Sequence, residues 1–339
     1  RVYKYNRRRT DNLEGVKNTY DPQGHLVADF VSDWEHQDPR QVKYSEDLIL
    51  DKALTFIRTH HSEPFFLYYA TQLPHGPVII PELGEFQNKP WSLKHREWAA
   101  MIRRLDESVG ALLDELEKHG IREDTIVFFA GDNGYSAWGY FGRRPWQDDP
   151  VFHNKGPWHK GKFICTNGGN RVPFLACWPG KIAPGRSSHV CATYNFLETA
   201  ADLAKVKPEK PTDGISLVSE LLGRGDQPEH RYLYWESGSR SPHAQAVLRD
   251  GFYAYRPHPD KPVQLYNETE DPGWEEDIAK DHPAVVEKVK GIFKEAHTDS
   301  TWYVNPGETK ARVSKKRKRA EEEGSLQESI SPNTVFPTR

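Results

Sequence analysis

Two adjacent residues with oxygen-bearing side chains, Asp132 and Asn133, directly follow a short apolar run. The run, Thr125 to Ala130, is rich in Ile, Val and Phe, a composition typical of a strand buried on both faces of a parallel sheet. Open α/β sheets bind their ligands at the carboxyl ends of such strands. A carboxylate and an amide oxygen in that position suit Ca²⁺ or Mg²⁺. The alternative interpretation is a plain turn, because Asp, Asn and Gly tolerate left-handed backbone geometry.

A long segment without a regular pattern, Gly134 to Arg171, follows this turn and is rich in Trp, Arg, Lys and His. Loops longer than roughly 12–15 residues inside a compact domain are usually functional or disordered. The aromatic content argues against disorder. We therefore predict that this loop forms the wall of a binding site. It ends in the glycine turn Asn167–Arg171, which leads into a second apolar run, Val172 to Trp178.

Three segments of this region resemble the arylsulfatase-like sulfatases, a family of the alkaline phosphatase superfamily. They read GDNGYSAWGYFGR, DDPVFHNKGPWHKGKF and GGNRVPFLACWPGKI. The resemblance continues upstream in YSEDLILDKALTFI and PFFLYYATQLPHGP, and downstream in QLYNETEDPGWEEDIAKDHPAVVEKV. Together these motifs run from about residue 40 to about residue 300, in the order of the family.

The resemblance implies four site residues. Asp132 and Asn133 match two ligands of the divalent cation of the family, usually calcium, with magnesium as the other option. His75 matches the histidine that contacts the sulfate ester, and Lys162 matches the lysine that neutralises a sulfate oxygen. A cation and a fixed ammonium would stabilise the charge that develops on sulfate, and a histidine could protonate the departing oxygen. Lys160 competes with Lys162, and a turn histidine and a solvated surface lysine are the structural alternatives.

The sequence also departs from the family pattern. Asn167 stands where the family usually has a Glu before the two glycines, which puts a structural contact in doubt rather than the chemistry. The family nucleophile is a formylglycine made from the Cys or Ser of a Cys/Ser-x-Pro-x-Arg element, and this element and two further acidic metal ligands are not visible in the chain. Cys177 has only part of that pattern, and we interpret it as a strand residue. We therefore expect an N-terminally truncated, catalytically incomplete sequence.

Composition narrows the function classes. The chain has 339 residues and a formal net charge of −3, which gives no electrostatic reason to expect nucleic-acid binding. No stretch approaches the ~20 apolar residues of a membrane span. The three cysteines are too few for a disulfide framework. The resemblance implies a periplasmic or extracellular location, and the oligomeric state cannot be read from the sequence.

Periodicity predicts an α/β fold with a mostly parallel sheet flanked by helices, and a small C-terminal antiparallel α+β subdomain. The predicted units are the C-terminal part of a sulfatase catalytic domain over 1–227, the subdomain over 228–305 and a polar tail over 306–339. Helices are expected near 46–60, 93–119, 194–204 and 283–297, and strands near 64–70, 125–130, 172–178, 231–236, 244–249, 252–256 and 263–266. The strand–helix–strand order of 64–130 implies a right-handed parallel crossover.

Two classes of function remain open from the sequence. The first is a formylglycine-dependent sulfuric ester hydrolase that acts on a sulfated sugar or an aryl sulfate, with a phosphatase or phosphonate hydrolase of the same superfamily as the runner-up. The second is a non-catalytic relative that binds sulfated glycans through the same pocket. A sulfate ester of a small molecule or glycan is the expected partner in every sulfatase interpretation.

Overall fold

The computed structural model describes residues 19–28, 44–76, 78–136, 147–237, 243–299 and 315. Its strands are β1 (Thr19–Tyr20), β2 (Leu26–Ala28), β3 (Val127–Ala130), β4 (Phe174–Cys177), β5 (Leu233–Ser237), β6 (Ala244–Arg249), β7 (Phe252–Arg256) and β8 (Gln264–Asn267). Its helices are α1 (Ser45–His60), the 3₁₀ turn η3 (Gly84–Phe86), α2 (Leu93–Lys118), α3 (Asn167–Asn170), α4 (Asn195–Leu203), α5 (Val218–Leu222) and α6 (Pro283–Glu295). Trp138, Trp146 and most of the predicted tail lie outside the described residues.

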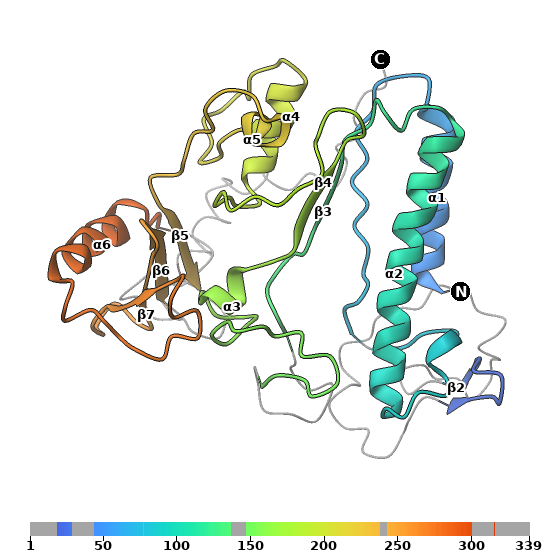
Figure 1. Cartoon of the computed structure of the whole chain (residues 1–339), viewed down its shortest axis with the longest axis horizontal. Coiled ribbons are helices and arrows are strands. Elements are labelled where there is room, and N and C mark those ends of the chain that lie inside the picture. Colours follow the sequence, from blue (N-terminus) through green and yellow to red (C-terminus); the bar gives the residue numbers. More distant parts are fainter. Residues whose placement is uncertain are drawn as a thin grey trace.

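Figure 1 shows three parts: α1 beside α2, the β3–β4 pair in the middle, and the four-stranded sheet with α6 at the opposite end. The predicted helix over 93–119 is confirmed as α2. Apolar residues recur in it at three- and four-residue steps, and Met101 and Leu116 are buried. Ser92 caps the helix by accepting a hydrogen bond from the His95 N–H at 3.3 Å.

A partly buried ion pair joins α1 to α2. Arg58 donates from Nε and Nη2 to the two oxygens of Glu115, at 3.0 and 2.9 Å. These hydrogen bonds, with a further one from His119, lower the pKa of Glu115 from 4.5 to about 2. A depressed carboxylate pKa stabilises the fold above the unfolded value, and this contribution disappears as the pH falls through the folded value.

We therefore expect the free energy of unfolding to fall as the pH drops from 4.5 toward about 2, through protonation of Glu115. Denaturant titrations followed by circular dichroism at stepped pH would measure this. The Arg58→Met variant is expected to be less stable near neutral pH and to show a shallower acid dependence. Equal pH slopes in wild type and variant would contradict this assignment.

The pairing of β3 and β4 corrects the predicted sheet. The two strands are antiparallel, with Val127 opposite Cys177 and Ala130 opposite Phe174. All strand pairs of the described residues are antiparallel, so the predicted parallel crossover is not observed. The crossover rule applies when a helix connects two strands of one sheet. Here β3 returns to β4 through a loop that starts and ends at the same end of the pair.

Residues 64–70, the first strand of the predicted crossover, run without ladder pairing in the structure. Phe66 and Tyr68 in this segment are 69% and 79% exposed. The prediction that β3 is buried on both faces is also wrong, because its residues are half-buried or exposed. Phe128 of β3 instead stacks on Phe174 at 5.9 Å and meets the edge of Phe196 of α4 at 5.5 Å.

The four predicted C-terminal strands are confirmed and form one antiparallel sheet in the order β5-β6-β7-β8. Alternation along the strands divides its apolar side chains between two faces. Val247, Ala254 and Leu265 pack against α6 through Ile292 and other residues of one cluster. Small and aromatic residues make a second cluster with residues of the long loop, namely Cys165, Ala244, Ala246, Tyr253, Tyr255, Tyr266 and Trp274. The sheet is thus a platform between α6 and the loop.

Candidate functional site

The long loop between β3 and β4 is closed at its base. The N–H of Gly131 donates to the carbonyl of Pro173 at 3.2 Å, continuing the ladder of the two strands. The Asp132–Asn133 turn therefore leaves the sheet at the same end at which the Asn167–Arg171 turn re-enters it. Antiparallel pairing thus places the carboxyl end of β3 beside the amino end of β4, and with them the two turns.

The two turns are in direct backbone contact. Gly134 donates its N–H to the carbonyl of Gly169 at 2.9 Å, and Lys162 donates its N–H to the carbonyl of Tyr135 at 2.8 Å. A Cβ at position 134 would lie 2.0 Å from the carbonyl oxygen of Gly168. Only glycine permits this approach. The segment of Lys162 and the Asp132–Asn133 turn are thus in direct contact through their backbones.

The short helix α3 carries the two glycines and sits inside the preceding part of the loop. A Cβ on Gly168 would lie 2.5 Å from the carbonyl oxygen of His159, and one on Gly169 would lie 2.0 Å from that of Ile164. Thr166 donates its hydroxyl to the same His159 carbonyl at 2.8 Å. The double glycine is therefore a packing requirement of the segment that contains Lys162.

The donor set of the turn partly fits a hard cation. Asp132 is exposed, and the amide nitrogen of Asn133 donates to the carbonyl of Gly134 at 3.0 Å. The amide oxygen of Asn133 is therefore the atom suited to a cation. Calcium takes six to eight oxygen ligands, and the described part of the chain has no group of three or more His, Cys, Asp or Glu residues placed to hold a metal. These two residues could supply only part of such a site.

The remaining candidates occupy different surroundings. Lys160 has a positive φ of 56° and burial lowers the pKa of its ammonium. The ammonium of Lys162 lies 5.5 Å from the centre of the Phe163 ring. His75 is exposed, and its Nδ1 lies 2.7 Å from the carbonyl of Gly76. The approach of His75 to the Asp132–Asn133 turn and the choice of Lys162 over Lys160 stay predictions.

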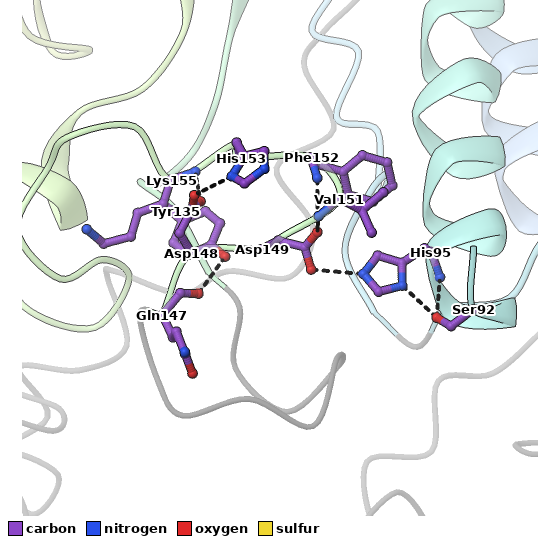
Figure 2. Close-up of polar contacts among 10 residues, drawn as sticks. All are labelled: Ser92, His95, Tyr135, Gln147, Asp148, Asp149, Val151, Phe152, His153 and Lys155. Carbon is purple, nitrogen blue, oxygen red and sulfur yellow. Dashed lines mark hydrogen bonds and ion pairs between the residues drawn. The ribbon is translucent and has the colours of Figure 1, made fainter. Parts of the chain in front are cut away.

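A second part of the loop is tied to α2, as Figure 2 shows. Asp149, 1% exposed, accepts hydrogen bonds from the backbone N–H groups of Val151 and Phe152 and lies 2.9 Å from Nε2 of His95. Burial opposes ionisation of Asp149, but these donors keep its pKa below the ordinary value. Since an ionised carboxylate only accepts, Nε2 of His95 carries the proton of this contact, while its Nδ1 lies 2.6 Å from the Ser92 hydroxyl oxygen.

Tyr135 joins these parts of the site. Its hydroxyl donates to the carbonyl of Gln147 at 3.1 Å, while its own carbonyl accepts from Lys162 (Figure 2 shows the first contact). Neither Tyr135 nor the His95–Asp149 pair was predicted from the sequence. The only signals in the sequence were the position of Tyr135, directly after the Asp132–Asn133 turn, and the acidic pair Asp148-Asp149 in the loop.

The sheet β5–β8 supports the other side of α3. Asn170 donates its amide to the hydroxyl of Tyr253 at 2.8 Å, and that hydroxyl donates to the carbonyl of Cys165 at 3.2 Å. The ring of His159 stacks on Trp274 at 4.9 Å, and burial lowers the pKa of this histidine. The loop is thus held between α2 and the C-terminal sheet.

The chain is similar in sequence to known proteins. The family model described as Sulfatase matches residues 2–206. The N-acetylgalactosamine-6-sulfatase of Rattus norvegicus is 36% identical over 180 residues, which are 52% of this chain and 32% of the relative. The N-acetylgalactosamine-6-O-sulfatase of Bacteroides thetaiotaomicron is 27% identical over 269 residues, 74% of this chain and 51% of the relative. The chain thus spans between a third and a half of the length of these relatives.

Solved structures show the same fold. The crystal structure of Ps i-CgsB in complex with k-i-k-neocarrahexaose has a TM-score of 0.66 at 22% identity, covering 86% of this chain and 63% of that one. The PsFucS1 sulfatase from Pseudoalteromonas sp. has a TM-score of 0.53 at 19% identity, covering 75% and 54%. These structures confirm the predicted α/β fold at the level of the family, while the predicted parallel pairing is not observed among the described residues. Among the described residues, no helix combines the length and the apolar character needed to cross a membrane.

Proposed function

Because the chain belongs to the sulfatase family, we propose that the protein to which it contributes hydrolyses sulfate esters at the site formed by the Asp132–Asn133 turn and the Lys162 loop. The observation that carries the proposal is the direct backbone contact of these two segments through Gly134, Gly169 and Tyr135. The resemblance implies both segments as parts of one site. Their meeting is what a common anion-binding site requires.

The chemistry of the side chains supports a compact transition state that gains negative charge. As the S–O bond breaks, this charge grows on the sulfate oxygens and on the departing oxygen. Lys162 would hold an ammonium toward a sulfate oxygen, a contact that strengthens as the charge grows. His75 would bind the ester oxygen and give it a proton as the bond breaks. The nucleophile that the resemblance implies, a formylglycine, has no counterpart in these residues.

A divalent cation, calcium or magnesium, would be held by the carboxylate of Asp132 and the amide oxygen of Asn133. When bound, it supplies Lewis-acid stabilisation of the sulfate oxygens. The small number of donors at the turn implies that other oxygens complete the coordination. The contact of Gly134 with Gly169 would fix this turn relative to Lys162, so that both act on one anion.

The expected substrate is a sulfated sugar. The relatives named above are an N-acetylgalactosamine-6-sulfatase and an N-acetylgalactosamine-6-O-sulfatase, and the aromatic side chains of the loop could stack on a sugar ring. An aryl sulfate is the simpler alternative. A periplasmic or extracellular location, inferred from the family, agrees with such substrates.

The proposal is tested by incubating the whole protein with N-acetylgalactosamine 6-sulfate, with an aryl sulfate and with the matching aryl phosphate, in the presence of Ca²⁺. Release of sulfate is the expected result. Release of phosphate alone would assign the protein to the phosphatase branch of the superfamily. Saturable binding of the sulfated sugar without turnover would identify a glycan-binding protein, and either outcome would overturn the proposal.

Replacing Lys162 by alanine is expected to lower kcat/KM for sulfate-ester hydrolysis about 100-fold, because one charged donor to the developing oxyanion is lost. The backbone hydrogen bond from Lys162 to Tyr135 is kept in this variant, and its melting temperature, measured in parallel, separates lost chemistry from lost stability. Steady-state kinetics of the Lys160→Ala variant provide the matched control. A larger loss in Lys160→Ala than in Lys162→Ala would transfer the role to Lys160.

A further inference from the structure

A buried carboxylate outside the proposed site contacts the glycine turn from the C-terminal sheet. Glu268 follows β8 directly and is 7% exposed. Its Oε1 accepts from Nε and Nη2 of Arg171 at 2.9 and 2.8 Å, and its Oε2 accepts from the amide of Asn167 at 3.2 Å. Glu268 thus binds the first residue of α3, which runs from Asn167 to Asn170, and Arg171 directly after it.

Both polar atoms of the Asn167 amide are fully used. Its oxygen accepts from the backbone N–H of His159 at 2.9 Å and of Gly168 at 2.7 Å. Its nitrogen donates to Glu268 and, at 2.8 Å, to the carbonyl of Pro272. The residue is completely buried. A carboxylate here would have no proton for Glu268 or for Pro272 and would place two negative charges side by side.

Arg171 extends the network to the start of the Lys162 segment. Its guanidinium lies 4.2 Å from the centre of the Trp158 ring, while its Nε and Nη2 bind Glu268. Trp158 precedes Lys162 and Arg171 follows it in the sequence. The contact between Trp158 and Arg171 therefore joins the two ends of the segment 158–171, and Glu268 binds this segment at Asn167 and Arg171. The backbone contacts of the segment to the Asp132–Asn133 turn lie between these ends.

We propose that Glu268 is a positioning residue, which acts through Asn167 and Arg171 to hold the Lys162 segment against the Asp132–Asn133 turn. The proposal rests on the sulfatase function proposed above. It also gives a reason for the departure at position 167: an amide is needed there because the carboxylate is supplied by Glu268 on the C-terminal sheet. The C-terminal sheet then takes part in catalysis by setting the place of an ammonium it does not touch.

A double-mutant cycle tests the proposal. Asn167→Asp keeps the size of the side chain but sets a second carboxylate beside Glu268, and we expect kcat/KM to fall about 100-fold, the effect of a misplaced catalytic group. Glu268→Gln is expected to lower kcat/KM about 10-fold. In the double variant, the amide introduced at position 268 can donate to the carboxylate introduced at position 167. This variant is expected to recover at least about 10-fold over Asn167→Asp, since residues in contact are not additive.

The measurements separate positioning from simple stability. Kinetics are compared at a temperature at which every variant is folded, together with the inhibition constant of inorganic sulfate, which should rise when the ammonium is displaced. Glu276→Gln, at an exposed residue near the same turn, is the control and should match wild type. Wild-type kinetics in Asn167→Asp, or strictly additive losses in the double variant, would overturn the proposal.

Backbone hydrogen exchange of residues 159–171 gives a readout independent of turnover. Faster exchange in Asn167→Asp that slows again in the double variant would support the positioning role even if wild type hydrolysed no sulfate ester, so that only the proposed function would fail. Unchanged exchange in all three variants would reject the role of Glu268 while leaving the sulfatase function intact.

Discussion

Replacing Asp132 by alanine is expected to abolish sulfate-ester hydrolysis in the whole protein, with activity reduced at least about 1,000-fold. The variant removes the only full negative charge of the Asp132–Asn133 turn, so the divalent cation loses its main ligand there. The cation would stabilise the charge on the sulfate oxygens in the transition state, which lowers the activation free energy by several kcal/mol. Isothermal titration with Ca²⁺ and kinetics on an aryl sulfate would measure both losses.

The control for this experiment is Asp124→Ala. Asp124 precedes the same strand, its side chain is 84% exposed, and its ion pair with Lys181 at 3.6 Å is a surface contact. Such pairs contribute about 0–1 kcal/mol, so this variant should bind calcium and turn over substrate as wild type does. Wild-type activity in Asp132→Ala would reject the metal assignment.

The second large effect is expected at Gly134. In Gly134→Ala the new methyl group would lie 2.0 Å from the carbonyl oxygen of Gly168 and 2.9 Å from the carbonyl carbon of Gly169. Both are backbone atoms, so the two turns must move apart and the hydrogen bond from Gly134 to Gly169 is lost. Overpacking of this kind costs about 1–3 kcal/mol. Separation of the Asp132–Asn133 turn from Lys162 should lower kcat/KM about 100-fold.

Gly110→Ala is the matched control. A methyl group at this position of α2 meets no atom within 4 Å, and alanine in a helix interior is more favourable than glycine by about 0.5–1 kcal/mol. Thermal unfolding should therefore shift upward for Gly110→Ala and downward for Gly134→Ala. If Gly134→Ala melted and turned over like wild type, the close approach of the two turns would be wrong.

Helices and strands could be predicted where the periodicity of their apolar residues is clear. The stripe of α2 has a three- and four-residue period and a capping serine, and β6 to β8 alternate between the two faces that contact α6 and the loop. Both periods follow from the local geometry of a helix or a strand, so they can be recognised without knowing which segment packs against the element. The strands at the C-terminal end were accordingly found to within a few residues of their bounds.

The central sheet could not be predicted in the same way. A short apolar run has the same composition whether its partner is parallel, antiparallel or absent, because pairing depends on segments far away in the sequence. Thr125 to Ala130 was correctly predicted to contain a strand, but its antiparallel partner is β4. The run over 64–70 has the composition of a strand and no ladder in the described structure.

The candidate site shows the same division. The residues implied by the resemblance include two segments that the structure joins, at Asp132–Asn133 and at Lys162. The contacts that join them were not predictable, because they are backbone hydrogen bonds of Gly134 and Tyr135 and carry no side-chain signature. Glu268 was equally hidden. It lies directly after β8, 101 residues from the amide it binds.

The most direct test of the central claim is a crystal structure of the protein with Ca²⁺ and inorganic sulfate. We expect the ion beside the Asp132 carboxylate and the Asn133 amide oxygen, with a sulfate oxygen within about 3 Å of the Lys162 ammonium and another near the His75 imidazole. A sulfate bound elsewhere, or an imidazole and an ammonium that face away from the Asp132–Asn133 turn, would contradict it.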